Sequence, residues 1–294
     1  MSLAWVSGAS LVVLCWAGGT WLSVTGRRRA AVLFAGATPG VGPTVRAQLS
    51  GTALNRVVPA NGGLVSSHLQ LLRSHGLPAT AALLGYGASH LLAHLFAGAA
   101  VVAVLLAGWL PGSLDPQLPS PGLGALALVV VAPVLAIPRV RALALCGLRH
   151  VWEAVALAGR RPGAIVRLAG FELGTLLLLG TGLWIAVLAC GGSVSLPMAV
   201  SVWVLCNVVA GAVPAPGGAG PLDVALVATL SAVGVAGSES VEAVAMFRVV
   251  THWMPVPLGL IALGGFVPRR RRNPEARAAA SEGQPLPALA LHAF

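Results

Sequence analysis

Val58-Pro-Ala-Asn-Gly-Gly63 and Val213-Pro-Ala-Pro-Gly-Gly218 are two copies of one six-residue phrase in a chain of 294 residues. Each copy lies inside a largely apolar region. Proline removes a helical hydrogen-bond donor and glycine costs helix stability, so each copy predicts a break in a helix. Breaks at matching places in two halves of a membrane chain are typical of inverted repeats that build a binding site between them. The repeated phrase therefore predicts the position of the site as well as the organisation of the chain.

The composition predicts an all-α integral membrane protein with several spans. Hydrophobic residues make up 57% of the chain and charged residues only 9%, and the mean hydropathy is +0.88. A soluble domain needs more polar surface than this to cover itself. All 18 basic residues are arginine and the net charge is +10. Because the arginines cluster beside apolar segments, we expect them to anchor helix ends, not to bind nucleic acid.

Arginine counting predicts the topology. A spanning helix needs about 20 apolar residues, and five segments qualify: 3–25, 80–109, 122–138, 164–190 and 243–266. Arginines follow the first and last segments and precede the fourth, whereas the linkers 111–121 and 234–242 contain none. Cytoplasmic loops are enriched in arginine, so we expect a cytoplasmic C-terminus. Together with the Ala-, Gly- and Arg-rich usage, this predicts a multi-pass protein of a bacterial inner membrane.

The two regions that hold the repeated phrase, about 34–76 and 196–233, each begin and end on one side of the membrane. Each must dip in and return as a re-entrant hairpin, or cross twice as two short spans. With hairpins, the chain divides into a transmembrane domain at 1–267 and a disordered cytoplasmic tail at 268–294. The domain contains inverted repeats, at about 3–109 and 164–266, and a connector at 110–163.

The residues around both copies resemble a known family. Val213 to Asp223, followed by Phe247-Arg248 and Trp253-Met-Pro255, is similar to the C-terminal signature of the lysylphosphatidylglycerol synthase transmembrane, or flippase-like, family. Its N-terminal signature resembles Asn55-Arg-Val-Val-Pro59 with Gly62-Gly63, then His75-Gly76. The resemblance covers most of the chain, from about residue 10 to 266.

This chain departs from the family at three points. Leu64 stands where the family usually has an acid after the first glycine pair, and Asp223 replaces the usual glutamate after the second. The family commonly has one more helix before the first span, so the chain is expected to be short there. Members with a cytosolic aminoacyl-transferase domain make lysyl-lipid, and this chain lacks that domain. The resemblance therefore implies handling of a lipid without its synthesis.

Arg248 and Asp223 are the charged residues that most strongly suggest a site. A charge at membrane depth costs about 2.5–3.5 kcal/mol on insertion scales, so it usually has a partner or a function. Arg248 is expected to contact an anionic headgroup directly, or to pair with Asp223 or Glu172, or to reach the interface. Asp223 lies near the start of a returning half-helix, where it would cap that helix or couple transport to protons.

The remaining candidate residues belong to the breaks themselves. Exposed glycine N–H groups at a helix start favour an anion, although close helix packing also requires glycine. Arg56 either faces phosphate or lies at the interface, and Asn55 is expected to donate to freed backbone carbonyls. The predicted substrate-binding residues are Arg248, Asp223, Gly217, Gly218, Pro214, Arg56, Pro59, Gly62 and Gly63.

Two histidine-containing pairs share an i,i+4 spacing, which places each pair on one helical face. They are His90 with His94 in the first half and Arg248 with His252 in the second. His90 and His94 have metal-ligand spacing, but no further ligand lies beside them in the sequence, so we expect no metal site and no cofactor.

The expected function is binding or translocation of an anionic lipid or lipid-linked intermediate, with membrane lipids as partners. The alternative is an accessory membrane subunit of an envelope-lipid or glycolipid pathway, with an envelope-biosynthesis protein as partner. We expect no enzymatic activity because no paired acid and base, and no activated nucleophile, is present in the sequence.

Overall fold

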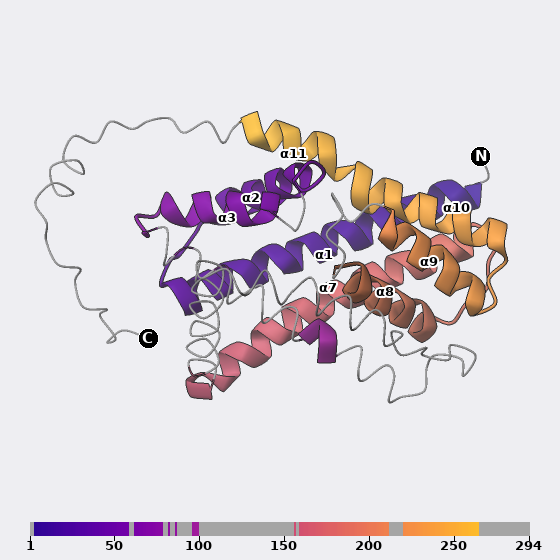
Figure 1. Ribbon diagram of the computed structural model, residues 1–294, viewed down its shortest axis with the longest axis horizontal. Coiled ribbons are helices and arrows are strands. Elements are labelled where there is room, and N and C mark those ends of the chain that lie inside the picture. Colours follow the sequence, from indigo (N-terminus) through magenta and orange to yellow (C-terminus); the bar gives the residue numbers. More distant parts are fainter. Residues whose placement is uncertain are drawn as a thin grey trace, which may run out of the picture.

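The computed structural model describes residues 3–58, 62–78, 159–211 and 220–264, together with residues 82, 86, 96–99 and 156. These residues form helices and no strand, as the composition predicts (Figure 1). The helices are α1 Leu3–Ala35, α2 Val41–Leu54, α3 Gly62–Arg73, α7 Pro162–Ala189, α8 Leu196–Gly211, α9 Pro221–Ala232, α10 Gly237–Arg248, the π-helical η2 Val249–Trp253 and α11 Pro255–Gly264. The predicted span 122–138 and the tail 268–294 lie outside the described residues, as do nearly all of the span 80–109 and the connector 110–163.

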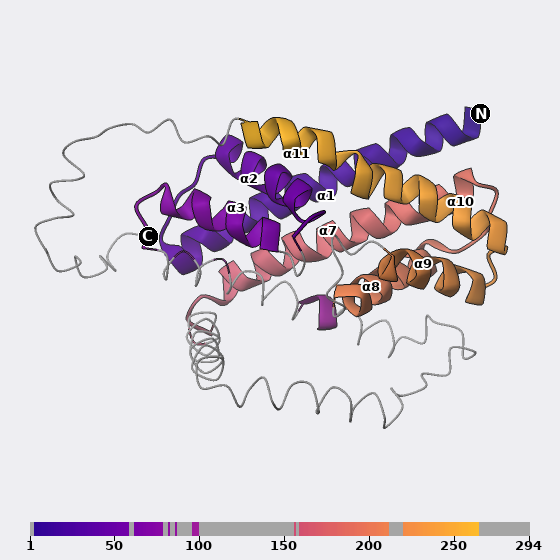
Figure 2. The same cartoon turned by 45° about the horizontal axis from the view of Figure 1, so that its top comes forward.

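An antiparallel pair of long helices, α1 and α7, forms the centre of the molecule (Figure 2). Gly8 lies against Ala189 near one end of the pair, and Gly26 lies against Phe171 near the other. A methyl group on Gly8 would collide with the Cβ atom of Ala189. Small residues therefore let the two backbones approach closely, as is common between membrane helices. Both helices are long and apolar enough to cross a membrane.

Two short helical hairpins flank this pair at opposite ends. The first hairpin, α2–α3, lies beside the C-terminal half of α1, and the second, α8–α9, lies beside the C-terminal half of α7 (Figures 1 and 2). Each helix of these hairpins has 12 to 16 residues. At 1.5 Å per residue they are about 18–24 Å long, which is shorter than the ~30 Å apolar core of a bilayer. The first copy of the repeated phrase ends in the first turn of α3, at Gly62 and Gly63, and the second copy follows α8 and precedes α9 in the sequence, outside the described residues.

A third long helix, Gly237–Gly264, consists of α10, η2 and α11 in one continuous run and is also apolar enough to span. Its α10 half packs on α7 and α9, and its α11 half packs on α2. Gly259 makes the second contact possible, because a methyl group there would collide with the Leu49 carbonyl and the Ala53 side chain. The helix therefore contacts both hairpins along its length.

Two helices extend beyond the predicted spans, for reasons that the sequence contains. The first span was expected to end at residue 25, but α1 continues through Arg27, Arg28 and Arg29 to Ala35, because arginine is a good helix former. The chain turns only at Gly36, whose φ of +65° favours glycine. The last span was expected to begin at residue 243, but α10 begins at Gly237, because an acid such as Glu239 is favourable in a first helical turn.

Large apolar side chains cover the outer faces of the long helices. Leu14 on α1, Val166 on α7 and Ile261 on α11 are each at least 66% exposed. Polar side chains would normally cover such faces in water, whereas lipid solvates apolar side chains. The exposed faces therefore support a membrane location for the long helices.

Candidate functional site

Arg248 and Asp223 form an ion pair inside the bundle. The Arg248 Nε atom lies 2.5 Å from an Asp223 carboxylate oxygen, and Arg248 is only 9% exposed. The other carboxylate oxygen accepts a hydrogen bond of 3.2 Å from the Gly220 N–H at the start of α9. The expected pairing and the expected capping role of Asp223 are therefore both present. Gly220 has a φ of +85°, so this cap depends on glycine.

Arg56 and His252 form a second polar contact in the same region. The Arg56 Nη1 atom lies 2.6 Å from the His252 Nδ1 atom, and His252 is buried. Arginine can only donate, so Nδ1 must accept and the imidazole proton resides on Nε2. His252 is therefore neutral in this arrangement. Arg56 follows α2 in the turn before the first break and is partly buried.

These two contacts meet on one stretch of the third long helix. Arg248 is the last residue of α10, and His252 belongs to η2, which follows it directly. The first hairpin contributes Arg56 and the second contributes Asp223, so both hairpins contact this stretch. The π-helical geometry is shown by the Met254 N–H, which donates to the carbonyl of Val249 at 2.8 Å. Single π-helical turns inside α-helices are rare and frequently occur at functional sites.

The charges at this place are unequal. Among the described residues, Arg56 and Arg248 carry two positive charges, Asp223 carries one negative charge, and His252 is neutral. The Arg248 Nη2 atom is buried without a hydrogen-bond partner among the described residues. A buried donor without a partner costs about 1–3 kcal/mol. The site therefore has a net positive charge and donor capacity that an anion would satisfy.

The first break is closed by a side-chain cap. The Asn55 Oδ1 atom accepts a hydrogen bond of 3.0 Å from the Leu64 N–H. Asn55 was expected to donate to backbone carbonyls, and because this contact uses its carbonyl oxygen, that expectation stays a prediction. The groups left without a helical partner at the start of α3 are N–H groups, so the side chain must accept there.

Close packing accounts for Gly62 and Gly63, which were predicted to contact substrate. A methyl group on Gly63 would lie 2.7 Å from the Asn55 Oδ1 atom, and one on Gly62 would lie 2.6 Å from a Val58 methyl group. Both glycines thus allow the start of α3 to lie close to the end of α2. Their role in binding stays a prediction.

The other predicted site residues at the breaks, Pro59, Pro214, Gly217 and Gly218, lie outside the described residues, as do His90 and His94. Within the part of the chain that the structure describes, no group of three or more His, Cys, Asp and Glu side chains could hold a metal ion. His252 is the residue that the prediction missed. Its i,i+4 spacing from Arg248 was the available signal, but its partner Arg56 is 196 positions away.

Comparison with protein families assigns the chain. The family described as "Lysylphosphatidylglycerol synthase TM region" matches residues 1–259, which is most of the chain. The chain belongs to this family. The resemblance inferred from the residues around the repeated phrase is thereby confirmed, and with the apolar helices it supports a membrane location. A search of curated proteins finds no match to the chain.

Within this lysylphosphatidylglycerol synthase TM region protein, the two hairpins differ in the charge that they contribute. Asp223 in the second hairpin is acidic and caps α9. Leu64, which follows the glycine pair of the first hairpin, is uncharged and packs partly buried beside α2. The first hairpin instead contributes the positive charge of Arg56.

Proposed function

We propose that this protein binds the phosphate of an anionic lipid, or of a lipid-linked intermediate, and moves the headgroup across a bacterial inner membrane. The observation that carries this proposal is the convergence of Arg56, from one hairpin, and Arg248 on a single stretch of the third long helix. Guanidinium groups bind phosphate through two parallel hydrogen bonds. The described residues of the site carry more positive than negative charge, which favours an anion over a zwitterion.

In the proposed site, the Asp223 carboxylate occupies the place on Arg248 that the phosphate of the ligand would take. In the described state the carboxylate neutralises Arg248. An incoming phosphate would take over this contact, and the released Asp223 would still cap α9 through the Gly220 N–H. The acyl chains would remain in lipid along the exposed apolar faces. The proposal assigns binding and movement to the protein, without a chemical reaction.

Alternating access would come from the symmetry of the two halves. Because α1 and α7 are antiparallel, the two hairpins reach the third long helix from opposite ends of the bundle. This arrangement supports re-entrant hairpins in inverted repeats that enter from opposite membrane faces, with the C-terminus in the cytoplasm. Movement of one half against the other would exchange the contacts of Arg56 and Arg248, and so expose the site to each side in turn.

The test is headgroup translocation in proteoliposomes. The full chain is reconstituted with fluorescent phosphatidylglycerol or fluorescent phosphatidylcholine, and a membrane-impermeant quencher reports the fraction of probe in the outer leaflet over time. We expect phosphatidylglycerol to cross faster than in empty vesicles and faster than phosphatidylcholine. Arg248→Gln should abolish the difference, whereas Arg73→Gln, at the exposed end of α3, should retain it.

Equal rates with and without protein, at every imposed proton gradient, would contradict translocation. Anionic lipid that still co-purifies under those conditions would leave the binding part of the proposal and favour the accessory-subunit alternative. Absence of both translocation and bound lipid would overturn the proposal entirely.

A further inference from the structure

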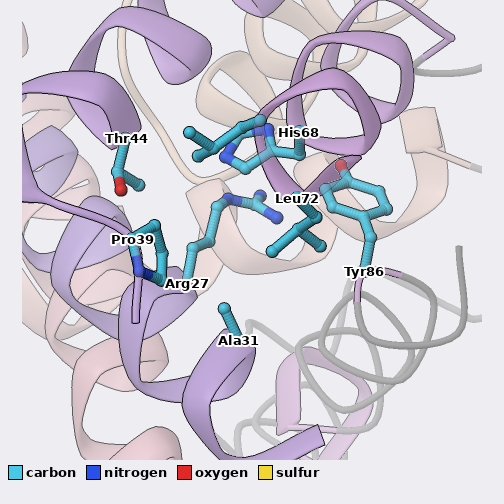
Figure 3. Close-up of a pocket in the computed structure, with 8 residues that line it drawn as sticks. Arg27, Ala31, Pro39, Thr44, His68, Leu72 and Tyr86 are labelled. Atoms are coloured by element: carbon cyan, nitrogen blue, oxygen red, sulfur yellow. The ribbon is translucent and has the colours of Figure 1, made fainter. Parts of the chain in front are cut away.

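A small cavity lined by both polar and apolar side chains lies away from the Arg56–Arg248 site, at the end of the molecule where the first hairpin meets α1 (Figure 3). Arg27 and Ala31 of α1 line one side, and Thr44 of α2 and His68 of α3 line another. Tyr86 is buried and completes the wall. We propose that this cavity is a separate phosphate-binding site, with Arg27 as its principal ligand. The proposal does not depend on translocation.

Arg27 has a charge that the described residues do not neutralise. Its guanidinium carbon lies 5.5 Å from the centre of the Tyr86 ring, a distance typical of a cation–π contact. The Nε atom of the guanidinium is buried without a hydrogen-bond partner among the described residues. A buried donor without an acceptor is costly. The cavity therefore lacks a counter-ion that can accept hydrogen bonds.

The His68 Nδ1 and Thr44 hydroxyl groups of the cavity donate their protons to backbone carbonyls. The His68 Nδ1 atom lies 3.0 Å from the Leu64 carbonyl, which can only accept, so Nδ1 carries a proton. The Thr44 hydroxyl donates to the Gly40 carbonyl at 2.8 Å, and the ring of His68 lies 5.2 Å from that of Tyr86. These contacts fix the side chains around Arg27. The described lining residues include no acid, so a metal cation would meet only the positive charge of Arg27.

The size and position of the cavity limit the ligand. Its volume is about 20 Å³, on a scale where one water needs about 10–15 Å³, so the interior admits one water or one anion oxygen. The remaining atoms of a phosphate group would lie at the open mouth. Arg27 lies about 36 Å from Leu3 along α1 at 1.5 Å per residue, which exceeds the ~30 Å apolar core. With Leu3 at the opposite membrane surface, Arg27 would lie at the level of the lipid headgroups, so the phosphate belongs either to a lipid headgroup or to a free phosphate ion.

Neighbouring arginines provide matched controls. Arg29 is exposed and lies outside the lining of the cavity, so Arg29→Gln removes the same charge from the same helix turn without changing the site. Arg28 is unsuitable as a control because its Nε atom donates to the Pro39 carbonyl at 3.0 Å and holds the loop before α2. Arg27→Gln removes the proposed ligand, and Arg27→Lys retains its charge but not its two-pronged geometry.

The chain contains a single tyrosine, Tyr86, which provides a direct spectroscopic probe. The full chain labelled with 3-fluorotyrosine gives one ¹⁹F signal, from the wall of the cavity. In one arm, the protein in phosphatidylcholine nanodiscs is titrated with inorganic phosphate at constant ionic strength. In the other arm, phosphatidylglycerol replaces part of the nanodisc lipid and no phosphate is added.

We expect the ¹⁹F signal to shift saturably in at least one arm. Arg27→Gln should weaken the response at least tenfold, Arg27→Lys should weaken it less, and Arg29→Gln should leave it unchanged. A shift with inorganic phosphate alone assigns a free phosphate ion, and a shift with phosphatidylglycerol assigns a lipid headgroup. No shift of the wild-type signal in either arm would overturn the proposal, even if a variant fails to fold. Equal weakening by Arg27→Gln and Arg29→Gln would also overturn it.

Discussion

The Arg56 Nη1 atom lies 2.6 Å from the His252 Nδ1 atom, although 196 positions separate the two residues in the chain. This contact joins the first hairpin to the middle of the third long helix. Four residues earlier on that helix, Arg248 joins the second hairpin through Asp223. One stretch of helix is thus bound to both hairpins, and a change at either hairpin would affect the same residues.

The first prediction concerns the energy of the Arg56–His252 contact. His252→Leu removes the acceptor and leaves the half-buried guanidinium of Arg56 with one contact fewer, so we expect a loss of about 1–3 kcal/mol in the free energy of unfolding. Arg56→Gln should also destabilise the protein. Because both changes break one contact, the double variant should be less destabilised than the sum of the single variants by at least ~0.5 kcal/mol.

Reversible unfolding in mixed detergent micelles provides the measurement. Arg73→Gln is the control for loss of a positive charge in the first hairpin, because Arg73 is exposed at the end of α3. Strict additivity of Arg56→Gln and His252→Leu would show that the two side chains are not coupled.

The second prediction tests whether packing explains the glycine pair of the first phrase. A methyl group on Gly63 would lie 2.6 Å from the Leu54 Cβ atom and 2.7 Å from the Asn55 Oδ1 atom. Gly63→Ala should therefore destabilise the protein by about 1–3 kcal/mol, in the range for overpacked sites. Gly170→Ala in α7 is the control, because a methyl group there meets nothing within 4 Å. It should be neutral or stabilising by up to ~1 kcal/mol. The same unfolding assay compares the two, and equal stabilities would contradict the packing explanation.

The third prediction concerns the opposite entry of the two hairpins. Ser74 follows α3 and Ser193 precedes α8, and both residues are exposed. Single cysteines placed at these positions in a cysteine-free chain should react with a membrane-impermeant maleimide from opposite sides of the membrane. Whole cells and inverted vesicles give the two accessibilities. We expect the residue 193 cysteine to react in whole cells and the residue 74 cysteine in inverted vesicles. Reaction of both from one side would rule out the inverted topology.

The sequence contained enough information for the long helices and for the positions of the breaks. Apolar length predicted the spans near 3–25, 164–190 and 243–266, and the repeated phrase located the turn of each hairpin. The ends were less accurate, because Arg27 to Arg29 continue α1 as readily as they would end it. The apolar composition of a segment predicts whether it can lie in a membrane. It does not predict where the helix ends, because that depends on local features such as the positive φ of Gly36.

The site could be predicted only in part, because its contacts are long-range. Arg248 and Asp223 were predictable as charges in apolar surroundings, which require a partner. The contact between Arg56 and His252 depends on how α2 packs against α11, and no local pattern encodes that packing. Arg27 was missed for another reason. It belongs to a cluster of three arginines that the positive-inside rule explains without a site, and only the cavity distinguishes it from Arg29.

The final prediction separates Asp223 as a competitor from Asp223 as a ligand. If its carboxylate occupies the place of a phosphate on Arg248, Asp223→Asn should strengthen the binding of phosphatidylglycerol, because a neutral amide competes less well for the guanidinium. The change removes the repulsion between the partly exposed Asp223 carboxylate and the phosphate. We expect this to strengthen the binding free energy by about 0.5–1 kcal/mol, or the affinity by roughly two- to fivefold. Asparagine can still cap α9, so folding should be retained.

Binding is measured by native mass spectrometry of the purified chain with increasing phosphatidylglycerol, and Glu239→Gln, at the start of α10, controls for the change in net charge. Weaker binding in Asp223→Asn would show that the carboxylate assists the headgroup, and would contradict the exchange of Asp223 for phosphate on Arg248.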